Sequence, residues 1–480
     1  MAAASILVQR LRNAFGLSRQ AARAVVRSYD SGAGGRRWAG AGAMPTTIGA
    51  QLAAGPRIAQ RARYLAANNG HAAAGVEAWV SELVGSGLKP QSAHPDPVMR
   101  AAINARFDQW CDEADVDGAS DFFGLQAQVA RRLVVDGEIF ATMFIDDGRR
   151  LRVRLIDGAQ VDGAYHTELA AGARIVAGIE FDARGQRVAY HLWRSRPGLP
   201  LAAPVDLIRL PAEDVVHVFR AETPGQVRGV SWFAPVLLRL ADLDKAHDAQ
   251  LMRQQIAAMM AGFITDPNGG NGGFEGSRAA DGALDGGLEP GTLKVLQPGQ
   301  DIRFSEPATI GQEATDFLRV TAREIAAGLG VPYEAMTGDM SQVNYSSIRA
   351  GLVAFRRRVE ALQHNTLVFQ FCRPIWRRWV TAEILSGRLD APGFEQDPEA
   401  YLAARWLPPK VDWVDPLKDA QAEILAINAG LMSRRQAVAA RGYDLEQLDT
   451  EIAQDRAVAQ AQGLSFSSSV SPSAGQGEQQ

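Results

Sequence analysis

The sequence of 480 residues predicts an α+β protein that is mainly helical. Long segments repeat apolar residues at steps of three and four, the spacing of one helix face, most clearly in 232–262, 312–329 and 347–385. Short segments rich in β-branched residues, separated by turn residues, occupy much of the stretch from 139 to 219. No run of eighteen or more apolar residues interrupts this pattern, so no membrane span is expected.

The N-terminal residues 1–50 are predicted to be a basic, flexible arm that is rich in arginine, alanine and glycine. Such a composition also fits a transit peptide, and the arm is a candidate for cleavage. Helical spacing then predicts a helix over 54–84, which the glycines around Ser86 end. Two further helices are expected over 99–112 and 123–135.

A β region follows these helices. Strands at 139–145 and 151–156 flank the turn residues Asp-Asp-Gly and predict a hairpin. A second hairpin is predicted from 175–181 and 188–193, and one more short strand from 215–219. Together with the preceding helices, these strands predict a mixed α+β domain.

The middle of the chain alternates long helices with loops. A helix over 232–262 is followed by a glycine-rich loop, short strands at 293–297 and 302–304, and a helix over 312–329. A polar loop then leads to a long helix over 347–385. The apolar stripe of that helix has a near-heptad spacing and comprises Ile348, Leu352, Phe355, Val359 and Leu362.

The C-terminal part is predicted to be helical, with breaks at Pro392, Pro408, Pro409 and Pro416. Its last residues are rich in serine, glycine and glutamine, which predicts a disordered tail. The net charge of −4 is not that of a free DNA-binding domain, which is usually strongly basic. The two cysteines lie far apart and suit a reducing compartment better than a disulfide.

No catalytic motif is present. The sequence lacks a nucleotide-binding GxxxxGK[ST] loop, a zinc-binding HExxH motif and a GxSxG elbow, and its seven histidines are scattered. Glu113, Asp115 and Asp117 imitate the start of a calcium loop, but Gly124 stands where the bidentate glutamate should be, so a turn is the better interpretation. Asp136 and Glu138, expected on one strand face, have no third ligand. We therefore expect no catalytic residue, no metal and no cofactor.

Several long segments resemble, in order, those of lambda-family bacteriophage portal proteins. The most specific are PGQVRGVSWFAPVLLRLADLDKAHDAQL at 224–251, GLGVPYEAMTGDMSQVNYSSIRAGLVAFRRRVE at 328–360 and VDPLKDAQAEILAINAGLMSRRQAVAARG at 414–442. Weaker likeness extends over 68–90 and 121–140. The resemblance covers nearly the whole chain.

This resemblance implies a portal fold with wing, stem, clip and crown regions that assembles into a ring. Mapped onto the chain, it implies an arm at 1–50 and a wing and core domain at 51–228, followed by a first stem helix at 229–264 and a clip at 265–308. A second stem helix at 309–332 and a tunnel loop at 333–346 come next. The rest of the chain would form a long core helix returning to the wing at 347–414, crown helices at 415–463 and a disordered tail at 464–480.

The resemblance also implies a function. A ring of about twelve subunits would form the DNA channel at one capsid vertex, for terminase-driven genome packaging, head–tail joining and DNA ejection. The implied partners are double-stranded DNA bound without sequence preference, the terminase large subunit, the major capsid protein and head-completion or adaptor proteins. The protein would belong to the virion, and to the bacterial cytoplasm during assembly. Its glycine-rich clip would dock the terminase, unless residues 266–290 are only a flexible insertion.

Candidate DNA contacts lie in and after the polar loop. They are Gln342, Asn344, Tyr345, Ser346 and Arg349, which can donate hydrogen bonds to phosphates. Gly338 is the expected loop hinge, and Asp339 would keep the contact from becoming too strong. Alternatively, Ser346 and Ser347 cap the following helix.

A second group of residues is expected to act between subunits. Three consecutive arginines point to different faces of one helix, so at least one should form an ion pair with a neighbouring copy, for example with its Glu360. The group comprises Arg356, Arg357, Arg358 and Glu360.

Two other functions compete with the portal hypothesis. A DNA-processing enzyme, such as a metal-dependent nuclease, predicts carboxylates converging in one pocket. Another ring-forming virion component, such as an adaptor, predicts a much shorter chain without this order of helices.

Overall fold

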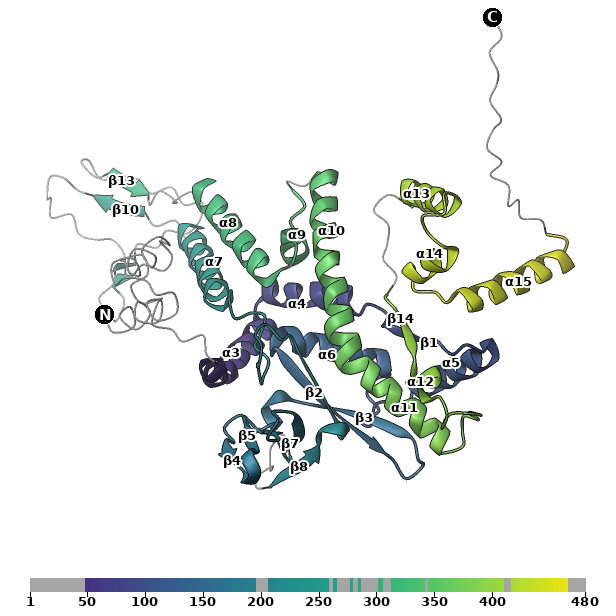
Figure 1. The fold of residues 1–480 in the computed structure, drawn as a ribbon. Coiled ribbons are helices and arrows are strands. Elements are labelled where there is room, and N and C mark those ends of the chain that lie inside the picture. The colour runs from purple at the N-terminus through teal and green to yellow at the C-terminus, as the bar shows by residue number, and fades with distance from the viewer. Residues whose placement is uncertain are drawn as a thin grey trace, which may run out of the picture.

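The computed structural model describes the following residues: 48–195, 206–258, 262–265, 277–278, 284–285, 301–304, 312–341, 344–409 and 416–464. A body of helices and sheets lies at the centre, with a pair of helices on one side and the C-terminal helices on the other (Figure 1). The predictions for the arm before residue 48, the strand at 293–297 and the tail after 464 fall outside the described residues.

The predicted helix over 54–84 is in fact two helices, α3 (Ile48–Asn68) and α4 (Gly70–Leu83). Asn69 separates them, because its backbone is extended and its side chain accepts a hydrogen bond from the Ala72 N–H, as an N-cap does. The predicted helices at 99–112 and 123–135 are confirmed as α5 (Pro97–Cys111) and α6 (Phe122–Val135). Asp96 and Asp121 cap them.

The predicted β region forms two antiparallel sheets. The first has the order β3 (Leu151–Ile156), β2 (Glu138–Ile145), β9 (Val215–Phe219), which confirms the first hairpin and the single strand. The second sheet runs from β4 to β8 in chain order. Its strands are β4 (Thr167–Glu168), β5 (Arg174–Val176), β6 (Ile179–Phe181), β7 (Arg187–Trp193) and β8 (Leu207–Pro211).

One strand prediction was wrong in its length. The expected strand over 175–181 is two strands, β5 and β6, because Ala177 and Gly178 both have positive φ and turn the chain between them. The alternation of apolar residues continues across this turn, so the pattern did not reveal it.

Aromatic side chains fill the core beneath the β2–β3–β9 sheet. Phe107, Phe122, Trp376 and Trp379 are almost fully buried and meet edge to face or at tilted angles, which adds to the stabilisation from burial alone. The two tryptophans come from α11 (Arg373–Leu385), and Phe107 comes from α5. The C-terminal half of the long helix is thereby packed against the aromatic core that α5 and α6 contribute.

The two helices on the side of the body are α7 (Leu237–Ala258) and α8 (Gln312–Leu329). The prediction for α8 is confirmed at both ends, whereas the helix predicted over 232–262 is shorter. Gly262–Thr265 is a strand, β10, which pairs antiparallel with β13 (Asp301–Phe304). A smaller ladder joins β11 (Ser277–Arg278) to β12 (Leu284–Asp285).

The long helix begins earlier than predicted and is not uniform. It consists of α10 (Tyr345–Leu362), a π-helical segment (Gln363–Cys372) and α11. Two glutamines of the wider π turns bond to neighbouring elements: Gln363 donates to the Leu83 carbonyl at 2.9 Å, and Gln370 accepts from the Phe219 N–H at 2.8 Å. The short helix α9 (Tyr333–Thr337), which the sequence did not indicate, precedes α10.

The C-terminal part was predicted to be helical, but it also contains a strand. After α12 (Pro398–Leu402), the strand β14 (Ala404–Leu407) pairs antiparallel with β1 (Lys89–Ser92). The segment expected to form the crown contains α13 (Pro416–Asn428), α14 (Arg434–Ala440) and α15 (Leu445–Ala461), which keep the name crown helices below. Ion pairs join the crown to the body, such as Arg100 with Glu446 at 2.8 Å.

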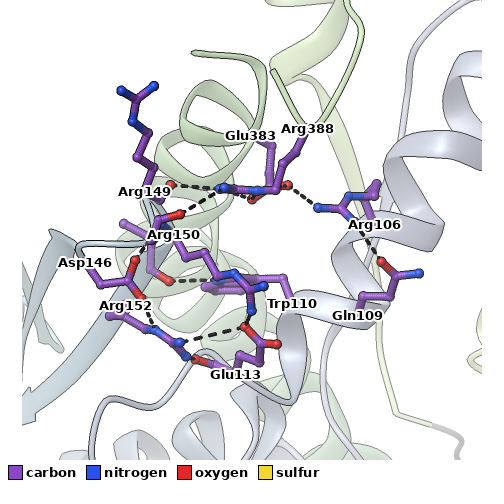
Figure 2. A network of polar contacts seen from close by, with 12 residues as sticks. Arg106, Gln109, Trp110, Glu113, Asp146, Arg149, Arg150, Arg152, Glu383 and Arg388 are labelled. Atoms are coloured by element: carbon purple, nitrogen blue, oxygen red, sulfur yellow. Dashed lines mark hydrogen bonds and ion pairs between the residues drawn. The ribbon is translucent and has the colours of Figure 1, made fainter. Parts of the chain in front are cut away.

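A buried carboxylate ties the end of α11 to the tip of the β2–β3 hairpin (Figure 2). Glu383 is almost fully buried and bonds to Arg106 and Arg388. Arg388 in turn donates to the backbone carbonyls of Gly148 and Arg149. Burial alone would raise the pKa of Glu383, but the hydrogen bonds and charges of the two arginines hold it below its usual value.

A second buried carboxylate, Glu138, joins β2 to β9. It accepts hydrogen bonds from Arg228 at 2.7 Å, from the Gly229 N–H at 2.8 Å and from the His217 ring at 3.0 Å. Against the cost of burial, the Arg228 charge and these bonds lower the pKa of Glu138 to about 2. His217, stacked on Phe140, has its pKa lowered to about 4, because burial disfavours its charged form more than Glu138 favours it.

Acidification is expected to destabilise the wing between about pH 6.5 and pH 4. Native His217 stays neutral down to about pH 4, whereas the unfolded chain takes up this proton near pH 6.5, so unfolding binds a proton throughout this window. The loss is on the order of 3 kcal/mol over the whole window. Urea unfolding at pH 7 and at pH 5 measures the part of this stability loss that falls between these two pH values. His217→Gln should start less stable but lose less stability between these two pH values; an equal loss in both proteins would contradict the assignment to His217.

Candidate functional site

The polar loop between α9 and α10, residues 338–344, is hereafter called the channel loop, after the role expected of it from the sequence. Gly338 ends α9 in the left-handed conformation, with φ of 71°, and its N–H bonds to the Glu334 carbonyl at 2.8 Å. No atom lies within 4 Å of where a Cβ would stand, so only the backbone conformation favours glycine at this position. This conformation is compatible with the predicted hinge, which stays a prediction.

Asp339 holds the base of the channel loop. Its carboxylate accepts hydrogen bonds from the Tyr333 hydroxyl at 2.9 Å, the Ser341 N–H at 3.0 Å and the Ser341 hydroxyl at 2.6 Å. These bonds, those from Ser341 first, lower the pKa of Asp339 to about 2. Arg319 of α8 lies 3.9 Å away, so the carboxylate also links the loop to that helix.

Asp339→Ala is therefore expected to loosen the channel loop without unfolding the protein. It leaves the Ser341 amide without its acceptor, and hydrogen exchange at that amide should accelerate by about tenfold. The melting temperature should change little, because the Asp339 side chain is 31% exposed and lies in a loop outside the core. Glu334→Ala, which removes another acid nearby, serves as the control. Unchanged exchange at Ser341 would show that Asp339 does not hold the loop.

The predicted DNA contacts fall into three structural situations. Gln342 lies outside the described residues. Asn344 is exposed, and its carbonyl accepts from the Ile348 N–H at 3.2 Å at the start of α10. Tyr345 and Ser346, expected in the loop, belong to the first turn of α10. Because α10 begins at Tyr345, Ser346 and Ser347 lie inside the helix and not at the N-cap position that the alternative gave them.

Arg349 lies one turn into α10 and contacts the crown. Its guanidinium is 3.2 Å from Asp419 of α13, and its side chain is 47% exposed. Exposed ion pairs of this kind contribute little, so breaking the pair with Asp419 costs little free energy. The pair brings together residues that are seventy positions apart in the sequence.

The four residues expected to act between subunits differ in their surroundings. Arg356 lies 3.7 Å from Glu82 of the same chain, and Arg358 donates to the Gly330 carbonyl at 3.1 Å. Arg357 and Glu360 are exposed, and none of the described residues forms an ion pair with either. The arginine best placed to meet another molecule is thus Arg357.

Within the described part of the chain, no group of three or more histidines, cysteines, aspartates or glutamates is arranged to hold a metal ion. In the turn at 115–119, predicted in place of a calcium loop, Asp115 accepts hydrogen bonds from the Asp117 and Ala119 N–H groups.

Asp136 was expected on a strand, but it lies at the C-terminal end of α6. It and Glu138 line a cavity of about 780 Å³, in which Arg63 and Arg228 pair with them. These carboxylates give the nuclease hypothesis no support.

Both cysteines are buried, and burial raises the pKa of each thiol. Among the described helices, none is long and apolar enough to cross a bilayer.

Residues 34–363 match the family described as phage portal protein, lambda family. The chain is 25% identical over 417 residues to a probable portal protein of Halomonas phage phiHAP-1, which covers 83% of this chain and 79% of that protein. It is 24% identical over 459 residues to portal protein B of Escherichia phage lambda, at 84% of each chain. A solved structure titled as the neck of a native gene transfer agent particle is 15% identical, with a TM-score of 0.46, and covers 78% of this chain and 91% of the other.

Proposed function

The chain belongs to the lambda family of phage portal proteins, and we propose that it assembles into a ring whose central channel carries double-stranded DNA. Portal proteins are structural, and we assign the chain no catalytic step. In this proposal the work of moving DNA comes from a separate ATPase, the terminase, and the ring acts as wall, docking platform and valve. The ring would contain about twelve subunits.

The observation that supports this function best is the extent of the family match. It runs from residue 34 to 363 and so includes the part of the body from α3 to β9, both side helices α7 and α8, the channel loop and α10. We propose that the channel loop and Arg349 line the channel. In a ring, one Arg349 per subunit becomes a girdle of positive charge facing a duplex with one phosphate per about 1.7 Å of its axis.

The chemistry of the loop suits a sliding contact. Asn344 and Ser341 are neutral polar residues that bond weakly to phosphates without sequence preference. Asp339 places a negative charge at the base of the loop, which opposes tight binding. A loop with several arginines would instead hold DNA in a salt-dependent manner and slow its movement.

We propose two docking regions at different ends of the subunit. The strands β10 and β13 project beyond α7 and α8, away from the crown helices (Figure 1). They belong to the region assigned to the clip, which would bind the terminase large subunit during packaging and head-completion proteins afterwards. The wing would contact the major capsid protein at the portal vertex of the virion, after assembly in the bacterial cytoplasm.

Deletion of the gene from its phage tests this function. Particles made without the chain should contain no nuclease-protected genome, and expression of the wild-type chain in trans should restore it. A normal yield of protected genome from the deletion would overturn the proposal.

A further inference from the structure

Helix α8 exposes a second apolar face. Its inward face carries Ile325 and Leu329, which are 1% and 4% exposed. On another face, Phe317 is 62% exposed and Val320 is 52% exposed. Leaving two large apolar side chains in water at adjacent positions of one helix face is unfavourable, and such a face usually has a partner.

Five of the exposed residues of α8 follow a regular spacing. They recur at alternate steps of four and three, which is the spacing of a seam between two packed helices. The stripe comprises Glu313, Phe317, Val320, Glu324 and Ala327. Glu324 has no ion-pair partner among the described residues.

Helix α10 carries a matching stripe. Its inward face, the stripe predicted from the sequence, includes Phe355 and Val359 at 2% and 4% exposure. Its outward face shows the same steps of three and four, with Val353 at 46% exposure. This outward stripe comprises Ala350, Val353, Arg357 and Glu360.

The two stripes are complementary when laid side by side in parallel. Val320 then meets Val353, the large Phe317 meets the small Ala350, and the acidic Glu324 meets the basic Arg357. Both helices start at the same end of the molecule and run towards α4 (Figure 1). The end of α8 lies beside the middle of α10, since Arg358 bonds to the Gly330 carbonyl at 3.1 Å.

We propose that the exposed stripe of α8 in one subunit packs in parallel against the exposed stripe of α10 in a neighbouring copy, with Glu324 paired to Arg357 between subunits. The two stripes are different surfaces, so the contact is head to tail and closes into a ring when the rotation between copies allows it. The inference rests on the proposed function for the existence of the ring. If the contact forms, α10, the helix that follows the channel loop, is supported in each subunit by α8 of the neighbouring subunit.

Charge reversal tests the pairing. Glu324→Arg and Arg357→Glu each place like charges across every interface, so the fraction of protein in rings should fall by about tenfold at equal concentration. The chain with both substitutions should assemble like the wild type. A mixture of the two single variants should also assemble, because alternating subunits restore an opposite-charge pair at every interface. Asp455→Arg makes the same charge change on the exposed face of α15 and is the control. Mass photometry gives the ring fraction.

Either single variant assembling as well as Asp455→Arg, or a mixture that does not regain rings, would overturn the pairing. A wild-type chain that forms no rings would instead overturn the proposed function.

Cross-linking provides a second readout that does not depend on charge. Val320→Cys with Val353→Cys in one chain should give, on mild oxidation, a ladder of covalent oligomers, because each bond joins two subunits. Either single variant should stay monomeric on a denaturing gel, since Cys111 and Cys372 are buried. A double variant that remains monomeric would contradict the contact.

Discussion

Replacement of Glu138 by alanine is expected to lower the free energy of unfolding by about 3–5 kcal/mol, the cost of leaving a buried charge without its partner. The side chain of Arg228 is only 12% exposed, and it would keep its charge beside two backbone carbonyls after losing the carboxylate bonded to it. The Gly229 N–H would lose its acceptor as well. Because Glu138 begins β2 and His217 lies in β9, the pairing of these two strands should be the first to weaken.

The chain contains a matched control for this experiment. Glu180 also bonds to a histidine and an arginine, His191 at 3.0 Å and Arg209 at 2.8 Å. Arg209 is 52% exposed, so water can hydrate its charge when the carboxylate is removed. Glu180→Ala should therefore cost less than about 1 kcal/mol. Equal losses from the two alanine variants in urea unfolding would show that burial of the arginine does not control the effect.

The second large effect is functional. The double variant Arg349→Ala with Gln342→Ala is expected to form intact rings but to reduce the yield of packaged genome by on the order of tenfold or more, because each loss is repeated in every subunit of the channel. Ring assembly should persist, since Arg349 is half exposed and its ion pair with Asp419 contributes little.

Arg174→Ala in β5 is the control for this double variant, because it removes an exposed arginine of the wing, far from the channel loop in the sequence. Packaged genome is measured as nuclease-protected DNA per particle. A normal yield from the double variant would contradict the assignment of these residues to the channel wall.

Local signals in the sequence predicted individual elements well. The helix predicted over 312–329 is confirmed as α8 with the same bounds. Its C-terminal end could be predicted because Gly330 and Pro332 follow it and stop the helix. The β2–β3 hairpin is confirmed because the turn at residues 146–148 has the residues such a turn requires. The split at Asn69 was missed, since the apolar spacing continues across it and only a side-chain cap marks the break.

Contacts between distant segments could not be predicted in the same way. The strand β14 looks like part of a helical region until β1, more than three hundred residues earlier, pairs with it. Likewise, the sequence indicates that Arg356, Arg357 and Arg358 cannot share a role, but not which of them is engaged within the chain. Their partners, Glu82 and the Gly330 carbonyl, are fixed by tertiary packing.

The most direct test of the portal function is electron cryo-microscopy of the purified full-length chain. We expect a closed ring with a central channel wide enough for a DNA duplex, with residues 338–349 on the channel wall. A protein that remains monomeric, or a ring whose channel loop faces away from its central opening, would contradict this function.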